Sequence, residues 1–318
     1  MGAPRRVSRP TSVARYTLHR IGLAVPLLLA AAFLIFMAGR MAPGDPIVIR
    51  LGDHYDPKAA EVIRRELGLD QPLLVQFVRY MVSAIRFDFG ESFVRPGRRV
   101  GSIVRDALPI SLRLTAMAIT VAAGTGLTLG ILAAATVGSG FDRLIQIILL
   151  VTLSVPNFVI AAFLVLVFAV RMGVLPVAGL ADWRSYVLPV AVLAVLPTAY
   201  ITRIVRASML QAISEDYIRT AYSKGLSRRR AILHHALRNA TLPIITQVGL
   251  SFGYALTGSF IVEMIFNIPG MARVGVEAIF QRDYGVLQAV VLIYMAVFTF
   301  VNLLVDLSYA VLDPRVRY

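Results

Sequence analysis

The sequence predicts an all-α membrane protein with six transmembrane helices and a helical insertion between the first two spans. The first observation is composition: 58% of the 318 residues are hydrophobic, 16% are charged and the mean hydropathy is +0.74. Soluble domains are typically about 45–50% apolar and about 25% charged. The second observation is that six apolar stretches are long enough to cross a bilayer, which takes about 20 residues. A soluble protein of this length could not bury so much apolar surface.

The six apolar runs define the predicted order of parts along the chain. They cover residues 21–38, 114–141, 144–170, 185–202, 239–262 and 285–305. The expected organisation is a tail (1–20), a first span (21–39), an insertion (40–108) and a core (109–318) that includes a polar segment, 207–240. A tight turn is expected near 138–142, between the second and third runs. Some prolines fall inside spans, where neighbouring helices can satisfy the freed carbonyls; among them are Pro156, Pro189 and Pro197.

The basic residues indicate which way the chain crosses the membrane. One side of the predicted bundle collects sixteen Lys and Arg residues, mainly from the tail and from segment 207–240, whereas the short loops on the other side hold four. Because cytoplasmic loops are enriched in Lys and Arg, both termini are expected in the cytoplasm. The net charge of +14 is therefore interpreted as a signal of topology in a lipid bilayer, and no nucleic-acid partner is expected.

The insertion 40–108 is then expected outside the cell, where its sequence predicts two short amphipathic helices on the outer face of the bundle. Asp56 followed by Pro57 is typical of a helix start, and Gly68 is typical of a helix end. A second helix is expected after Pro72, because apolar residues follow largely along one side: Leu73, Leu74, Phe77, Val78, Tyr80, Met81 and Ile85. A cleaved signal peptide over the first span is disfavoured, since its apolar core is long and no clear A-x-A site follows.

Several chemistries are excluded by residues that the chain lacks. It has no cysteine, which excludes disulfides, thiolate metal sites and cysteine nucleophiles. Its two lysines, Lys58 and Lys224, do not follow glycine, so the Gly-Lys pair of an ATP-binding P-loop is absent. The predicted spans contain none of the four histidines, which are His19, His54, His234 and His235. We therefore expect no catalytic residue, no metal site and no cofactor in this chain, which is not an enzyme by itself.

The polar segment 207–240 is predicted to form two short helices joined at a glycine. Ser214 is a suitable N-cap, and Glu215 and Asp216 would lie in the first turn. Gly225 can adopt the left-handed conformation that ends a helix, and Ser227 can cap the second one. The small Ala221 and Gly225 would let the backbone of another protein approach, so we expect the first helix to present Tyr217, Ile218, Ala221 and Tyr222 to a partner. An ordinary basic cytoplasmic loop is the alternative interpretation.

The same segment resembles the coupling loop of ABC-importer permeases, in the form used by the oligopeptide/dipeptide subfamily. The broad family writes this loop as E-A-A, three residues and glycine. Here residues 219–221 (RTA) stand in the E-A-A position and Gly225 keeps its spacing. Arg238 stands where the broad pattern has proline, and Leu242-Pro243 follows as in the peptide-type form. This departure favours the peptide subfamily over the general class.

Further stretches resemble the same subfamily over residues 16–318. In order they are 42–46 (APGDP), 67–72 (LGLDQP), 88–93 (DFGESF), 108–109 (LP), 262–270 (VEMIFNIPG), 282–284 (RDY), 302–306 (NLLVD) and 312–318 (LDPRVRY). Each stretch is a weak signal alone. Together, in this order, they identify the chain as resembling a permease subunit of a peptide-type ABC importer.

The resemblance implies an importer of the bacterial inner membrane that is assembled from several chains. The implied partners are a second homologous permease subunit, two ABC ATPase subunits that bind ATP and Mg, and an extracytoplasmic solute-binding protein. The implied contacts with the ATPases are Glu215, Asp216, Tyr217, Ile218, Ala221, Tyr222, Gly225, Leu226 and Ser227. The implied function is ATP-driven import of di- or oligopeptides, although members of the subfamily also carry nickel complexes, sugars and opines.

The solute path is expected along the fifth span, on a stripe with spacings of four, three and four residues that falls on one helical face. The stripe consists of Gln247, Ser251, Tyr254 and Gly258, and it also suits simple helix–helix packing. An ion-coupled secondary transporter or a channel subunit is the alternative function. Such proteins keep ionisable groups at mid-membrane, whereas Arg113, Glu263 and Asp306 lie at or near span ends. We expect Glu263 and Asp306 to cap helices or to pair with arginine.

Overall fold

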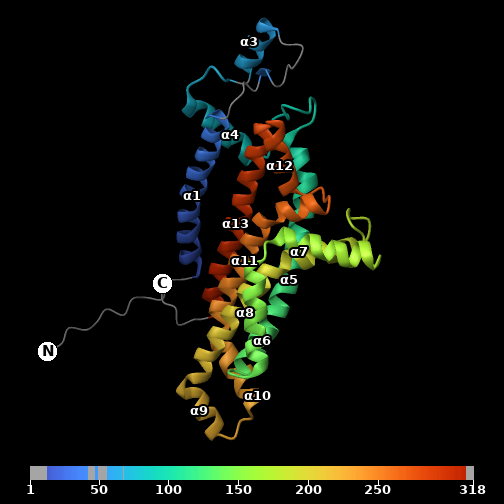
Figure 1. The fold of residues 1–318 in the computed structure, drawn as a ribbon. Helices are drawn as coiled ribbons and strands as arrows, with labels where there is room; N and C mark the ends of the chain where they lie inside the picture. The colour runs from blue at the N-terminus through green and yellow to red at the C-terminus, as the bar shows by residue number, and fades with distance from the viewer. Residues whose placement is uncertain (1–12, 42–46, 49–55, 67, 313–318) are drawn as a thin grey trace, which may run out of the picture.

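The computed structural model describes residues 13–41, 47–48, 56–66 and 68–312, and these residues are predominantly helical with no β-strand among them (Figure 1). The all-α prediction is therefore confirmed. The first twelve residues of the predicted tail, the motif at 42–46 and the end of the C-terminal motif, 313–318, lie outside the described residues.

Long apolar helices form the body of the molecule. The elements are α1 (Val13–Met41), α3 (Pro57–Glu66), α4 (Leu73–Ile85), α5 (Val100–Ala135), α6 (Gly140–Ser154), α7 (Asn157–Leu164), the π-helix η2 (Val165–Arg171), α8 (Arg184–Ser214), α9 (Asp216–Ser223), α10 (Arg228–Arg230), the π-helix η3 (Ala231–Ala236), α11 (Leu237–Ile265), α12 (Met271–Gln281) and α13 (Tyr284–Leu312). Among the described residues, five helical stretches are long and apolar enough to cross a membrane, and they fall on α1, α5, α8, the run from α10 to α11, and α13.

The third predicted span, 144–170, is broken in the structure. Its first part is α6 and its second part is α7 with η2, and the two parts are bent by 103°. The residue before a proline is pushed out of the helical region, and Val155, which precedes Pro156, is extended (φ −98°, ψ 123°). The stretch is therefore one span only if the bent pair is counted as one, which would bring the total among the described residues to six.

The core of the bundle is the close packing of α5 against α8. Two glycines of α5, Gly126 and Gly130, lie one turn apart, a spacing that lets helix backbones approach in membranes. A Cβ added at Gly130 would lie 2.5 Å from Cβ of Val205 and 2.8 Å from the carbonyl oxygen of Thr202. Both glycines are buried, so this contact depends on the absence of a side chain.

We expect Gly130→Ala to destabilise the subunit, because the added methyl group must displace both a side chain and a backbone carbonyl of α8. Overpacking of this kind costs about 1–3 kcal/mol. Gly124→Ala on the same helix is the matched control, since nothing lies within 4 Å of its added Cβ. Thermal unfolding in detergent checks the pair, and equal midpoints for the two variants would contradict the close packing.

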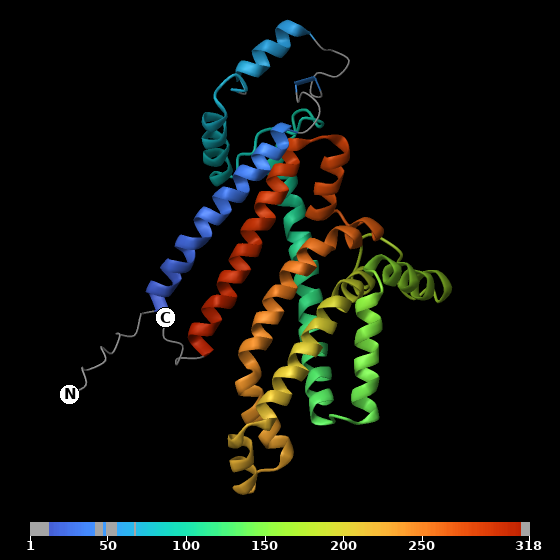
Figure 2. The same cartoon turned by 60° about the vertical axis from the view of Figure 1, so that its left-hand side comes forward.

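The short helices gather at the two ends of the bundle (Figure 2). Helices α9 and α10 form one end, called here the α9 end, and α3 with α4 forms the other, called the α3 end. The two helices predicted within the insertion are therefore present. The Asp56 carboxylate accepts a hydrogen bond of 3.0 Å from the Lys58 N–H at the start of α3, and Gly68 after that helix has a φ of +63°.

Candidate functional site

Segment 207–240 forms a helical corner at the α9 end (Figures 1 and 2). Helix α8 continues to Ser214, Glu215 is extended (φ −75°, ψ 150°), and α9 begins at Asp216. The prediction that Ser214 is the N-cap of this helix is wrong: its hydroxyl donates 2.7 Å to the carbonyl of Gln211 inside α8. Glu215 holds the N-cap position without a side-chain cap bond. A single extended residue, Glu215, therefore connects α8 to α9.

Gly225 ends α9 in the left-handed conformation, as predicted, with a φ of +81°. The N–H of Gly225 donates 2.8 Å to the carbonyl of Tyr222, and the N–H of Leu226 donates 3.2 Å to the carbonyl of Ala221. This pair of bonds is the Schellman motif. Ser227 then holds the N-cap position of α10 without a side-chain cap bond. The motif sets the direction in which the chain leaves α9.

One side of α9 packs on the chain itself. Ile218 and Ala221 are buried, and Ile218 shares a hydrophobic cluster with Ile232 and Ala236 of η3. The expectation that Ile218 and Ala221 are presented to a partner is therefore wrong. They are the apolar i and i+3 positions of an eight-residue helix, and a helix this short is held mainly by packing.

The rest of the α9 surface is open, and its two tyrosines flank the buried side. Tyr217 and Tyr222 keep 37% and 40% of their surface exposed. The other predicted contact residues outside the buried side are exposed too, except for the half-buried Leu226: Glu215, Asp216, Gly225 and Ser227. The surface available to another protein therefore combines two tyrosine rings with the acidic start of the helix.

A buried ion pair braces the corner against the rest of the bundle. The Arg206 guanidinium of α8 donates two hydrogen bonds of 2.8 Å to the carboxylate of Asp142 in α6, whose side chain is only 5% exposed. The same carboxylate accepts 3.0 Å from the Gly138 N–H in the α5–α6 turn. Arg228 of α10 donates 2.6 Å to the carbonyl of Ala135 at the end of α5. The sequence alone shows Asp142 and Arg206 only as charged loop residues. Their pairing was not predictable, because they are 64 residues apart in the chain.

Where α11 is followed by α12, a buried carboxylate holds the start of α12. Glu263 is fully buried and accepts hydrogen bonds of 2.6 Å from the Ser111 hydroxyl and 2.9 Å from the Arg273 N–H. The Ser111 oxygen accepts 2.7 Å from the Met271 N–H. Glu263 therefore caps a helix, as predicted. Asp306 pairs with Arg20 at 3.0 Å, which confirms its predicted pairing with arginine.

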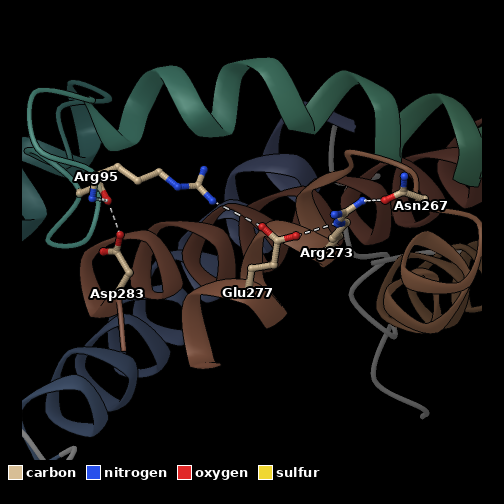
Figure 3. A network of polar contacts seen from close by, with 6 residues as sticks. Arg95, Asn267, Arg273, Glu277 and Asp283 are labelled. Carbon is tan, nitrogen blue, oxygen red and sulfur yellow. Dashed lines mark hydrogen bonds and ion pairs between the residues drawn. The ribbon is translucent and has the colours of Figure 1, made fainter. Parts of the chain in front are cut away.

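A second polar network, shown in Figure 3, joins the segment before α5 to α12 and α13. Glu277 accepts from Arg95 at 3.5 Å and from Arg273 at 2.7 Å, and Arg273 also donates to the side-chain oxygen of Asn267. The buried Asp283 accepts from the Ser92 hydroxyl and from the N–H of Phe93. These contacts tie the end of the insertion to α12 and to the start of α13.

The predicted stripe on α11 is not a continuous exposed polar surface. Ser251 is buried and accepts 3.2 Å from the Gln247 amide, and Gly258 is half-buried. Tyr254 is exposed, and its ring stacks on that of Tyr200 in α8 with centroids 6.4 Å apart. The open part of this face is therefore the tyrosine pair. Tyr254 belongs to the predicted stripe, whereas Tyr200 does not.

Two family patterns match the chain. Residues 126–318 match the family described as "Binding-protein-dependent transport system inner membrane component". Residues 13–115 match the family described as "Binding-prot-dependent transport system membrane comp, N-term".

The chain is also similar to curated proteins over nearly its whole length. It is 39% identical over 303 residues to the glutathione transport system permease protein GsiC of Escherichia coli (strain K12), which covers 95% of this chain and 99% of that protein. The GsiC proteins of Shigella flexneri serotype 5b (strain 8401) and Salmonella paratyphi A (strain ATCC 9150 / SARB42) match with the same identity and coverage.

Among solved structures, a chain of the inward-facing MetNI methionine ABC transporter superposes with a TM-score of 0.59 at 15% identity. The superposition covers 66% of this chain and 96% of the MetNI chain. A chain of an amino acid ABC transporter solved with histidines gives a TM-score of 0.52 at 20% identity, with 66% and 94% coverage. At these identities the likeness shows a shared fold.

Proposed function

Because the chain belongs to the family of binding-protein-dependent transport system inner membrane components, we propose that it forms half of the solute path of an ATP-driven importer of short peptides. A second homologous permease subunit supplies the other half. Two ABC ATPase subunits bind the α9 end from the cytoplasm, where both termini also lie. An extracytoplasmic solute-binding protein delivers the peptide at the α3 end.

A short peptide is the favoured substrate because the similar curated proteins are named as permeases for a peptide. The GsiC proteins, 39% identical over 95% of this chain, are named for glutathione, which is a tripeptide. Tyr254 of the predicted path and Tyr200 beside it form an exposed aromatic pair. Aromatic rings offer apolar contact together with a polar hydroxyl, which suits peptides of varied sequence.

The observation that carries the proposal is the braced corner at the α9 end. Movement of an ATPase against α9 can reach the spans only through a stiff connection, and rigid-body motion about an interface is the usual form of such transitions. The Gly225 turn sets the direction of the exit from α9, and the Asp142–Arg206 pair holds α8 to α6. ATP binding would close the ATPases, draw α9 inward and open the bundle to the outside.

We expect Gly225→Val to uncouple ATP hydrolysis from transport. The left-handed conformation costs a non-glycine residue about 1–2 kcal/mol, roughly a tenfold loss of the population with the native corner. Transport and ATPase activity of the reconstituted complex are measured side by side, together with the amount of ATPase that remains bound after purification.

Gly97→Val is the matched control. Gly97 also has a positive φ, +76° against +81° at Gly225, and nothing lies within 4 Å of an added Cβ at either position. Since Gly97 belongs to the α3 end, the control carries the same backbone strain away from α9. Equal transport per ATP hydrolysed in wild type and Gly225→Val would remove the proposed role of the corner.

A further inference from the structure

We propose that α4 is embedded in the lipid leaflet at the α3 end, with one side of the helix against the acyl chains. That side, called here the lipid face of α4, consists of Leu74, Val78, Val82 and Ile85, which are all exposed aliphatic residues. The inference goes beyond the transport function, because it gives a membrane-binding role to a helix of the predicted extracytoplasmic insertion. It follows from the composition of α4, from its packing and from its depth.

Helix α4 is strongly apolar, although it is too short to cross a membrane. Over its 13 residues it carries one charged side chain, Arg79. The lipid face follows spacings of four, four and three residues and therefore forms one stripe along the helix. Solvent-exposed protein surface rarely carries a contiguous apolar patch of this kind without a partner.

The opposite side of α4 faces the rest of the chain, and polar groups there are turned inward. Gln76 and Ala84 are buried. The Gln76 amide donates 2.6 Å to the carbonyl of Gln71 and 3.2 Å to the carbonyl of Leu69, in the turn between α3 and α4. The helix is therefore held in a defined rotation, which points the lipid face away from the chain.

Aromatic contacts with α1 set the depth of α4. The ring of Phe77 lies with its centroid 5.2 Å from that of Phe33 and 5.6 Å from that of Phe36, and the Tyr80 ring lies 5.8 Å from Phe36. Arg40 near the end of α1 is the first charged residue after Arg20 and marks the border of the apolar span.

Phe36 and Phe33 precede Arg40 by four and seven residues, which corresponds to about 6 Å and about 10 Å along a helix axis. Interfacial helices bury their apolar faces about 5–10 Å into the boundary between headgroups and acyl chains. Helix α4 therefore contacts α1 at the depth that such a helix occupies, and Figure 2 shows it beside the end of α1 and below α3.

Lipid is the occupant that fits best because the surface of α1 continues into the lipid face. The most apolar part of α1 is only 11% buried within the chain, and Leu34, between Phe33 and Phe36, is 68% exposed. A span that the chain leaves uncovered faces lipid for at least part of its circumference. A soluble binding protein would have to enter the headgroup region to reach the lipid face.

The absence of cysteine in this chain allows a direct test with a nitroxide spin label on a single introduced cysteine. The variant Val78→Cys is assembled with the other importer subunits made cysteine-free and is reconstituted in liposomes. Two controls have comparable exposure: Leu34→Cys on α1 and Val62→Cys on α3, where the native side chains are 68% and 56% exposed against 53% at Val78. Collision rates are measured with oxygen, which concentrates in the bilayer, and with a water-soluble nickel chelate.

We expect the ratio of oxygen to nickel collisions at Val78 to be several-fold higher than at Val62 and to approach the ratio at Leu34. A high nickel rate at Val78, equal to that at Val62, would place α4 in water and overturn the proposal. Low rates with both reagents would show that protein covers the face, which also overturns it. Ile85→Cys, on the same face, repeats the measurement independently, and none of these outcomes bears on whether the importer transports peptides.

Discussion

Replacing Asp142 by alanine is expected to destabilise the subunit by about 3–5 kcal/mol, the range seen when one partner of a buried ion pair is removed. The variant leaves the Arg206 guanidinium, whose side chain is only 23% exposed, without its carboxylate. It also removes the acceptor for the Gly138 N–H in the α5–α6 turn. Since the same pair braces the helical corner, ATP-driven transport should fall together with stability.

Thermal unfolding in detergent and transport in proteoliposomes measure the two effects. Asp216→Ala is the matched control for the unfolding measurement, because Asp216 also pairs with an arginine, Arg219, at 3.4 Å but on the exposed surface of α9. Exposed pairs contribute about 0–1 kcal/mol. The double variant Asp142→Ala/Arg206→Met should recover much of the loss, because no unpaired charge remains. An Asp142→Ala midpoint as high as that of Asp216→Ala would mean that the brace does not hold the bundle.

Replacing Glu263 by alanine is the second change with a large expected effect. It leaves the Ser111 hydroxyl and the Arg273 N–H without their acceptor in a fully buried position. Each buried donor left unsatisfied costs about 1–3 kcal/mol, and the start of α12 also loses the negative group that favours a helix N-terminus. We expect α12 to detach from its place between α11 and α13.

Glu263→Gln tests the hydrogen bonds apart from the charge, because glutamine keeps a side-chain oxygen but is neutral. The glutamine side-chain oxygen can still accept, so its loss of stability should lie between wild type and Glu263→Ala. Hydrogen exchange of the α12 amides, together with the unfolding midpoint, measures the effect. Glu277→Ala is the control on α12 itself, since that carboxylate is 30% exposed. Equal protection of α12 in Glu263→Ala and wild type would contradict the capping role.

Much of the architecture was predictable because its causes are local in the chain. Apolar runs placed the long helices, and the signals at Asp56 and Gly68 placed α3. The left-handed conformation at Gly225 was predictable in the same way, since the helix end and the glycine are adjacent in sequence. The resemblance of the 216–230 stretch to a known coupling loop agrees with the family matches over residues 13–115 and 126–318.

Two of the errors arose where parts of the chain distant in sequence decide the outcome. Ile218 and Ala221 were predicted to face a partner, but η3 returns beside α9 and buries them. Pro156 ends a helix, whereas Pro189 and Pro197 lie within α8. A proline inside a helix lowers the stability of that helix, and whether packing compensates depends on neighbours that the local sequence does not specify.

The sequence by itself therefore determined the class of the protein, its helices and the turn at Gly225, because hydrophobic periodicity and backbone preference act within a few residues. Only the tertiary structure decided which face of α9 is open, where the third apolar run bends, and how the charges pair. Asp142 meets Arg206 across 64 positions and Ser111 meets Glu263 across 152. A buried charge needs a partner wherever the fold brings one, and that partner is chosen by the packing of the helices rather than by distance along the chain.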